Sequence, residues 1–188
     1  MKRALIVVDY QKDFVTGSLG FPKAETLDRA IAAKIREYRS SGGDIIVTLD
    51  THAENYLETQ EGKNLPVIHC VRGTDGWSLF GGTAKQIRET DRKFEKGTFG
   101  SLALAEYLKK QGYEQVELVG VVSNICVISN AVLAKAALPG SLIVVDAACT
   151  ASNDDAMNEK ALDVMEGLQI KVVNRQHGSE RFPIEKES

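Results

Sequence analysis

The sequence predicts a doubly wound α/β fold, built on a mostly parallel sheet of five to six strands with helices on both faces. Short apolar runs rich in β-branched residues alternate along the chain with longer segments whose apolar residues recur at helical spacing. That alternation is typical of βαβ units, in which a helix connects two parallel strands. The length of 188 residues suits one domain, so a single domain over residues 1–188 is predicted.

The expected strands are short and apolar. The first, ALIVVD (4–9), is apolar at every position before its aspartate, which favours a parallel strand covered on both faces. Further strands of this kind are expected at 44–50, 114–122, 141–148 and 169–174. RKFEKG (92–97) is a short strand or an extended segment, and it decides whether the sheet has five or six strands.

The expected helices lie between these strands. They cover 25–43, 82–90, 101–112, 124–138 and 153–168. Several end at glycine or before proline, which stop helices, and the last begins with acidic residues, which the helix dipole favours there. The polar stretch 51–82 is interpreted as a long loop, and such a loop inside a compact domain is usually functional. The final residues, 178–188, are expected to form a loose tail.

The charge and hydropathy of the chain exclude several classes of partner. The net charge is -3, whereas nucleic acids and anionic membranes attract basic patches, so neither partner is expected. No apolar run approaches the roughly 20 residues of a membrane-spanning helix, and the N-terminal run is too short for a signal peptide. We therefore expect a cytoplasmic protein whose three cysteines, Cys70, Cys126 and Cys149, are free thiols.

Polar side chains stand where the predicted strands end. They are Asp9, Asp50, Ser123, Asn124, Cys126, Asp146 and Cys149. In open α/β sheets, ligands bind beyond the carboxyl ends of the strands, at a point where the strand order reverses. These side chains are therefore candidates for a site, although a helix cap or a turn is an equally good interpretation of any single aspartate.

Cys126 lies where a buried strand turns into a helix. The helix dipole lowers the pKa of a thiol in the first helical turn, and the unpaired N–H groups there can hold an oxyanion. These features favour a nucleophile over the alternative, a small buried hydrophobe. Asp9 would serve as the base if burial raised its pKa, and Lys96 would hold the thiolate. Cys70 and Cys149 lack a helix start and are interpreted as structural thiols.

The polar stretch contains a second group of candidate residues. In LDTHAENYLETQEGKNLPVIHC (49–70), Asp50 is followed by His52 and later by His69. Imidazole and carboxylate ligands together bind divalent metals. Polar loop residues that form turns and caps are the alternative, and the residues alone leave both interpretations open.

Three segments carry a resemblance to a known family. VVDYQKDF (7–14), EKGTFGS (95–101) and GVVSNICV (120–127) resemble, in order and spacing, the signature segments of the isochorismatase-like cysteine hydrolases. That superfamily contains nicotinamidases, carbamoyl-group amidohydrolases and isochorismatases. The resemblance implies that Asp9, Lys96 and Cys126 form the catalytic triad. It also implies a cis peptide between Val121 and Val122, with the amides of Val122 and Cys126 facing the substrate oxygen.

The metal interpretation also gains from this resemblance. DTH (50–52), the later HC (69–70) and the GTDG turn (73–76) resemble the metal-binding segment of nicotinamidases. The resemblance implies one divalent ion on Asp50, His52 and His69 that takes the ring nitrogen of the substrate, with zinc favoured and iron or manganese as alternatives. Glu61 is the first candidate for a fourth ligand, followed by Glu58 and Glu54.

The function implied is a metal-dependent amidohydrolase that converts nicotinamide to nicotinate and ammonia through a cysteine thioester, in NAD salvage. The nearest alternative is another cysteine amidohydrolase of this superfamily that acts on a carbamoyl or ureido group. A redox-sensing thiol and an isochorismatase are further alternatives. Phe14, Trp77 and Phe99 are candidate walls for a planar ring, with core packing as the alternative for the first two. The family often forms oligomers, so a homo-oligomer is expected.

Overall fold

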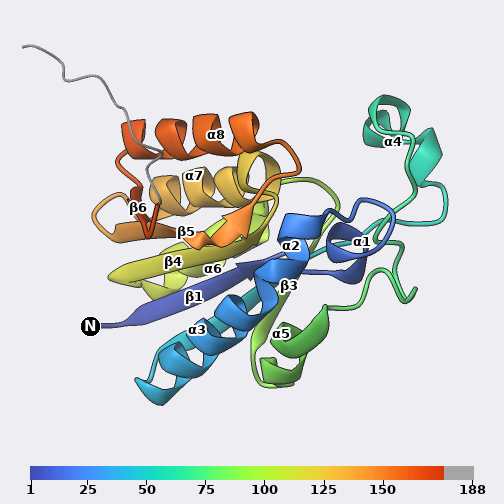
Figure 1. Cartoon of the computed structure of the whole chain (residues 1–188). Coiled ribbons are helices and arrows are strands. Elements are labelled where there is room, and N and C mark those ends of the chain that lie inside the picture. The colour runs from blue at the N-terminus through green and yellow to red at the C-terminus, as the bar shows by residue number, and fades with distance from the viewer. Residues whose placement is uncertain (176–188) are drawn as a thin grey trace, which may run out of the picture.

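The computed structural model describes residues 1–175, which form a single parallel sheet covered by helices on both faces (Figure 1). The six strands run in the order β3-β2-β1-β4-β5-β6, and every pairing is parallel. Their bounds are β1 Arg3–Val8, β2 Asp44–Asp50, β3 Arg92–Lys96, β4 Gln115–Val121, β5 Leu142–Ala151 and β6 Lys171–Val173. The structure confirms the predicted fold class, while the tail expected over 178–188 lies outside the described residues.

The helices divide into two layers. Their bounds are α1 Lys12–Val15, α2 Pro22–Thr26, α3 Asp28–Ser40, η1 Tyr56–Glu58, α4 Gln60–Asn64, α5 Gly81–Gln86, α6 Leu102–Gln111, η2 Ser123–Val127, α7 Ile128–Ala137 and α8 Asp155–Gly167. Helices α6, α7 and α8 pack on one face of the sheet, and α2 and α3 pack on the other (Figure 1). Each layer encloses its own apolar core.

Strand β1 lies at the centre of the sheet and contributes to both cores. Ala4, Ile6 and Val8 pack in the core beneath α6 to α8, whereas Leu5 and Val7 pack in the core beneath α3. This alternation follows from the period of two of a strand. The chain passes from β1 to β2 and β3 on one side, and then returns to β4 on the other side of β1. The carboxyl ends of β1 and β4 therefore mark the point where ligands bind in such folds.

Several elements differ from their expected limits. The helix expected at 25–43 is two helices, α2 and α3, which meet at Leu27. The polar stretch at 51–82 is not a plain loop, because it contains η1 and α4. Helix α4 has five residues, and the side chain of Thr59 caps it by accepting a hydrogen bond from the amide of Gly62 at 3.0 Å. A helix that short has too few residues to show periodicity in the sequence.

Two further differences occur near the carboxyl end of the sheet. Strand β5 extends to Ala151, beyond the expected 141–148, because it continues past a register shift opposite Leu118 and Gly120. The helix expected at 124–138 begins as a π-helical turn, η2, before α7.

Gly120 brings β1 and β4 close together at the switch point. Its φ is 112°, which side chains rarely adopt, and a Cβ there would lie 2.1 Å from the carbonyl oxygen of Val8. The backbone can therefore make this approach only with glycine. Among residues 1–175, no helix combines the length and the apolar character that crossing a membrane requires.

Candidate active site and metal centre

Asp9, Lys96 and Cys126 come together at the carboxyl edge of the sheet, from three different strands. Asp9 follows β1, Lys96 is the last residue of β3, and Cys126 lies in η2 after β4. The Nζ atom of Lys96 is 2.6 Å from Asp9 Oδ2 and 3.7 Å from the sulfur of Cys126. All three residues are buried, so a solvent-screened ion pair does not describe this cluster.

Burial and the neighbouring charges shift the pKa of all three groups in this cluster. Burial raises the pKa of Asp9, and the ammonium of Lys96 opposes that rise. Burial alone would lower the pKa of Lys96, but Asp9, Cys126 and Asp50 together raise it. Burial and the neighbouring Asp9 raise the pKa of the Cys126 thiol well above its usual value. Burial therefore opposes the lowering of this pKa that the helix dipole favours.

Three polar residues that the sequence did not single out hold this cluster in place. The hydroxyl of Thr48 donates to Asp9 Oδ1 at 2.6 Å. The carbonyl of Thr98 accepts from Lys96 Nζ at 2.9 Å. The side chain of Gln11 is fully buried and bonds both the amide and the carbonyl of Asp50, at 2.8 and 2.9 Å. A polar residue inside the apolar run of β2 is the one sequence signal that pointed to Thr48.

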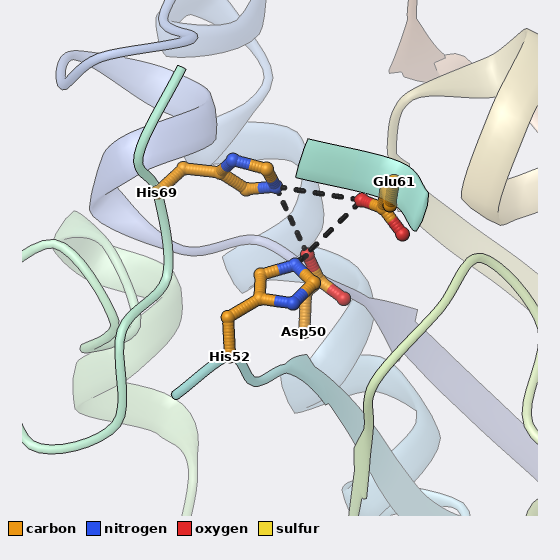
Figure 2. Close-up of side chains that lie close together, drawn as sticks. All are labelled: Asp50, His52, Glu61 and His69. Carbon is orange, nitrogen blue, oxygen red and sulfur yellow. Dashed lines mark hydrogen bonds and ion pairs between the residues drawn. The ribbon is translucent and has the colours of Figure 1, made fainter. Parts of the chain in front are cut away.

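A second cluster brings together two histidines and two carboxylates (Figure 2). Asp50 ends β2, His52 follows it, Glu61 lies on α4, and His69 lies in the loop beyond α4. Their ligand atoms all lie within 4.8 Å of one another. The Nε2 atoms of His52 and His69 are 2.9 and 3.4 Å from Asp50 Oδ2, and 3.7 and 3.9 Å from Glu61 Oε1.

This donor set fits a divalent metal ion. Two imidazole nitrogens and two carboxylates are ligands that zinc, iron and manganese accept. The Nδ1 atom of His69 lies 2.7 Å from the carbonyl oxygen of Val67. A carbonyl only accepts, so Nδ1 carries the proton and Nε2 offers its lone pair toward the cluster. Glu61, rather than Glu58 or Glu54, is the acidic residue that joins this group.

One cleft gives access to both clusters. It encloses about 650 Å³, including its open mouth. Its lining residues are Phe14, Leu19, Phe21, Asp50, Glu61, Leu65, His69, Phe99, Val122, Ile125, Cys126 and Asn153. The candidate nucleophile therefore shares a small space with three members of the metal cluster, between walls that are mostly apolar.

The aromatic candidates divide into two groups. Phe14 and Phe99 line the cleft, and Phe14 also packs its ring 5.5 Å from that of His69. Trp77 is not among the lining residues; its indole N–H donates to Thr51 Oγ1 at 2.8 Å, and its carbonyl accepts from Gln11. Trp77 supports the end of β2 instead of bordering the cleft.

The remaining expectations concern the peptide backbone and the other thiols. The peptide bond between Val121 and Val122 is cis, as the resemblance implied. Cys70 and Cys149 are free and buried, and burial raises the pKa of both thiols. Neither lines the cleft.

Comparison with known proteins places the whole architecture in one family. The isochorismatase domain matches residues 3–177. The chain belongs to the isochorismatase family. Within the family, the chain is 26% identical over 216 residues to the nicotinamidase of Saccharomyces cerevisiae, a match that covers 92% of this chain and 100% of the relative.

Two crystal structures of the isochorismatase fold are similar along most of the chain. The pyrazinamidase of Pyrococcus horikoshii in complex with zinc is 27% identical, with a TM-score of 0.81 over 92% of this chain and 99% of that one. The pyrazinamidase/nicotinamidase of Streptococcus mutans is also 27% identical, with a TM-score of 0.82 over 92% and 100% of the two chains. Over most of its length, the chain therefore shares its fold with proteins named as amidases.

Proposed function

We propose that this protein is a metal-dependent nicotinamidase, which hydrolyses nicotinamide to nicotinate and ammonia through a thioester on Cys126. The observation that carries the proposal is that Cys126 and the metal cluster line the same cleft. An amide held between them would have its carbonyl carbon near the sulfur and its ring near the metal ligands. The relatives named nicotinamidase and the zinc complex of a pyrazinamidase support this assignment.

The metal ligands in this proposal are Asp50, His52, Glu61 and His69, with zinc favoured over iron or manganese. When bound, the ion supplies a Lewis-acid site for the ring nitrogen of a pyridine carboxamide. Phe14 and Phe99 provide aromatic surface for the ring within the cleft. The side chain of Asp50 also contacts Lys96 Nζ at 3.2 Å, so the two clusters share one carboxylate.

The first half of the proposed reaction forms the thioester. Asp9 accepts the proton of the Cys126 thiol, and Lys96 stabilises the thiolate from 3.7 Å. The sulfur attacks the amide carbon, and the amides of Val122 and Cys126 stabilise the oxyanion. The carbon–nitrogen bond breaks as Asp9 returns its proton to the leaving nitrogen, which departs as ammonia.

The second half releases the acid. A water molecule gives a proton to Asp9 and attacks the thioester carbon, and the carbon–sulfur bond then breaks. The proton on Asp9 returns to the sulfur, so Asp9 and Cys126 regain their starting states. The balance is one amide and one water converted to one carboxylic acid and one ammonia. The same proposal assigns the enzyme to NAD salvage in the cytoplasm, as a homo-oligomer.

The test is ammonia release from nicotinamide by the purified protein, before and after chelation and zinc readdition. Wild-type protein should release ammonia, and Cys126→Ala should not. Cys149→Ala is the matched control, because it removes another buried thiol that lies outside the cleft, and it should retain the activity. If zinc-loaded wild-type protein leaves nicotinamide intact but hydrolyses a carbamoyl or ureido compound, the substrate assignment is wrong.

A further inference from the structure

Asn130 is a buried amide that the proposed mechanism does not use. It lies in the first turn of α7, and 1% of its surface is exposed. Its Nδ2 donates to the carbonyl of Cys126 at 2.8 Å and to the carbonyl of Phe99 at 3.0 Å. Its Oδ1 accepts from the amide of Ser101 at 3.0 Å. Both donors of this side chain are therefore occupied, by two segments that are distant in the sequence.

The two segments carry different parts of the active site. One is the η2 turn, which holds Cys126. The other is the loop 97–101, whose Thr98 carbonyl accepts from Lys96 Nζ and whose Phe99 lines the cleft. The same loop lies close to α7 at Gly100, where a Cβ would be 2.8 Å from Leu133 Cδ1.

The sheet alone does not fix these two segments relative to each other. Strand β3 leads into the loop 97–101 and β4 leads into η2, but β2 and β1 lie between them in the sheet. Lys96 and Cys126 therefore belong to segments whose strands are not neighbours in the sheet. A side chain that bonds both segments directly provides a shorter connection than the hydrogen-bonded ladder of four strands.

We infer that Asn130 is a positioning residue, which aligns the Cys126 turn with the loop that carries Phe99 and orients Lys96. The bond to the Cys126 carbonyl aligns the nucleophile. The bonds to Phe99 and Ser101 align the aromatic wall and, through Thr98, the ammonium. This role in substrate turnover rests on the proposed function, whereas the alignment of thiol and ammonium does not depend on the identity of the substrate.

Two substitutions separate the two halves of this role. Asn130→Ala removes all three hydrogen bonds. In Asn130→Thr, the hydroxyl can donate to the carbonyl four residues earlier in a helix, and that residue is Cys126. The threonine side chain is too short to reach Phe99 and Ser101 as well. Asn130→Thr therefore keeps the bond to the nucleophile turn and loses the bonds to the loop.

Two measurements report on the two halves. The pH profile of Cys126 alkylation by iodoacetamide, in a Cys70→Ala/Cys149→Ala background, reports on the alignment of thiol and ammonium. The kcat for nicotinamide reports on turnover, and the KM reports on the position of Phe99 in the wall of the cleft. Asn130→Ala should lose kcat by on the order of 100-fold, as a misplaced nucleophile does, and its alkylation midpoint should move to higher pH because Lys96 is less well placed. Asn130→Thr should keep the alkylation midpoint and raise KM by about tenfold.

Tyr38→Phe is the matched control for a simple loss of stability. It removes a buried hydrogen bond to Glu117, neither residue lines the cleft, and the substitution should change neither readout. Wild-type alkylation and kinetics in both Asn130 variants, per folded molecule, would overturn the inference. If Asn130→Ala does not fold, a wild-type KM in Asn130→Thr overturns it in the same way. A shifted alkylation midpoint in a protein that never hydrolyses nicotinamide would support the positioning role and reject the proposed function.

Discussion

Two lysines, Lys96 and Lys34, each lie between two carboxylates, but the partners of Lys96 include residues that line the cleft, whereas those of Lys34 do not. Lys96 is 2.6 Å from Asp9 and 3.2 Å from Asp50. Lys34, on α3, is 2.6 Å from both Glu117 in β4 and Asp146 in β5. The side chains are 2% and 17% exposed. By residue type, distance and burial, the two clusters are nearly alike.

The clusters differ in what completes them. Around Lys34, Tyr38 donates to Glu117 at 2.5 Å, and Asn174 and the amide of Ala148 donate to Asp146 at 3.0 and 2.9 Å. The carboxylates there are enclosed by protein donors. Lys96 instead contacts Asp50 and the thiol of Cys126, and both of these residues line the cleft. A perturbed buried charge therefore indicates a functional site only where the surrounding groups leave room for a substrate.

Replacing each lysine by methionine should separate the two roles most strongly. Lys96→Met should reduce kcat/KM for nicotinamide by on the order of 10³-fold, because the thiolate loses its counter-charge. Lys34→Met should lower the free energy of unfolding by about 3–5 kcal/mol, because Glu117 and Asp146 would remain buried without a cation. Ammonia release per folded molecule and urea unfolding of both variants measure these effects. A normal rate in Lys96→Met, or normal stability in Lys34→Met, would contradict the division of roles.

Zinc should stabilise the protein through the residues beside Lys96 and not through those around Lys34. A thousandfold excess of zinc over its dissociation constant should stabilise the chelator-treated protein by about 4 kcal/mol. His52→Ala should lose most of that gain, since it removes a ligand, whereas Lys34→Met should melt at a lower temperature but keep the full gain. Thermal unfolding with and without zinc measures both. An undiminished gain in His52→Ala would place the ion elsewhere.

The acid side of the pH–rate profile should report the environment of Asp9. Asp9 must be ionised to accept the thiol proton, so activity is present above its pKa and is lost as the pH falls through it. Burial raises that pKa, so the loss should begin above the ordinary aspartate value of about 3.9. A kcat/KM profile that stays flat down to that value would remove Asp9 from the role of base.

The smallest expected difference in stability and pH dependence concerns two hydroxyl groups. Thr48 donates to Asp9 beside Lys96, and Tyr38 donates to Glu117 beside Lys34. Each of Thr48→Val and Tyr38→Phe should cost about 1 kcal/mol of stability. Thr48→Val should also move the acid side of the pH–rate profile upward, because the lost donor favoured the ionised form of Asp9. Tyr38→Phe should leave the profile in place. Equal profiles for the two variants would mean that Thr48 does not tune the base.

The sequence predicted one cluster better than the other for a physical reason. Asp9, Asp50 and Cys126 stand at or just beyond strand ends, and the carboxyl ends of parallel strands meet along one edge. Glu117 lies inside an apolar run, and its burial required a partner that the sequence did not name. Lys34 lies 83 positions away on a helix, and only the packing of α3 on the sheet brings the two together.

Within the candidate site, the sequence also failed to predict side chains that form hydrogen bonds with backbone groups of distant segments. Asn130 and Gln11 bond main-chain groups of other segments, so their residue types carried no sign of a partner. Glu61 is the first candidate from the sequence, ahead of Glu58 and Glu54, but only its position on α4 shows that it joins the cluster. Trp77 is predicted as a wall of the site from its place in a polar loop, but its indole donates to Thr51, directly after β2.

All four proposed metal ligands come from one continuous stretch of chain, residues 50–69, whereas Asp9, Lys96 and Cys126 lie at or after the ends of three separate strands. The proposed metal site is therefore encoded by one continuous segment, whereas the proposed triad is encoded by three residues that are far apart in the sequence. An exchange of residues 51–69 between related chains would replace three of these four residues, His52, Glu61 and His69, in a single genetic event and leave Asp9, Lys96 and Cys126 intact. The proposed metal dependence is thus a trait that recombination could add or remove while Cys126, the proposed nucleophile, stays unchanged.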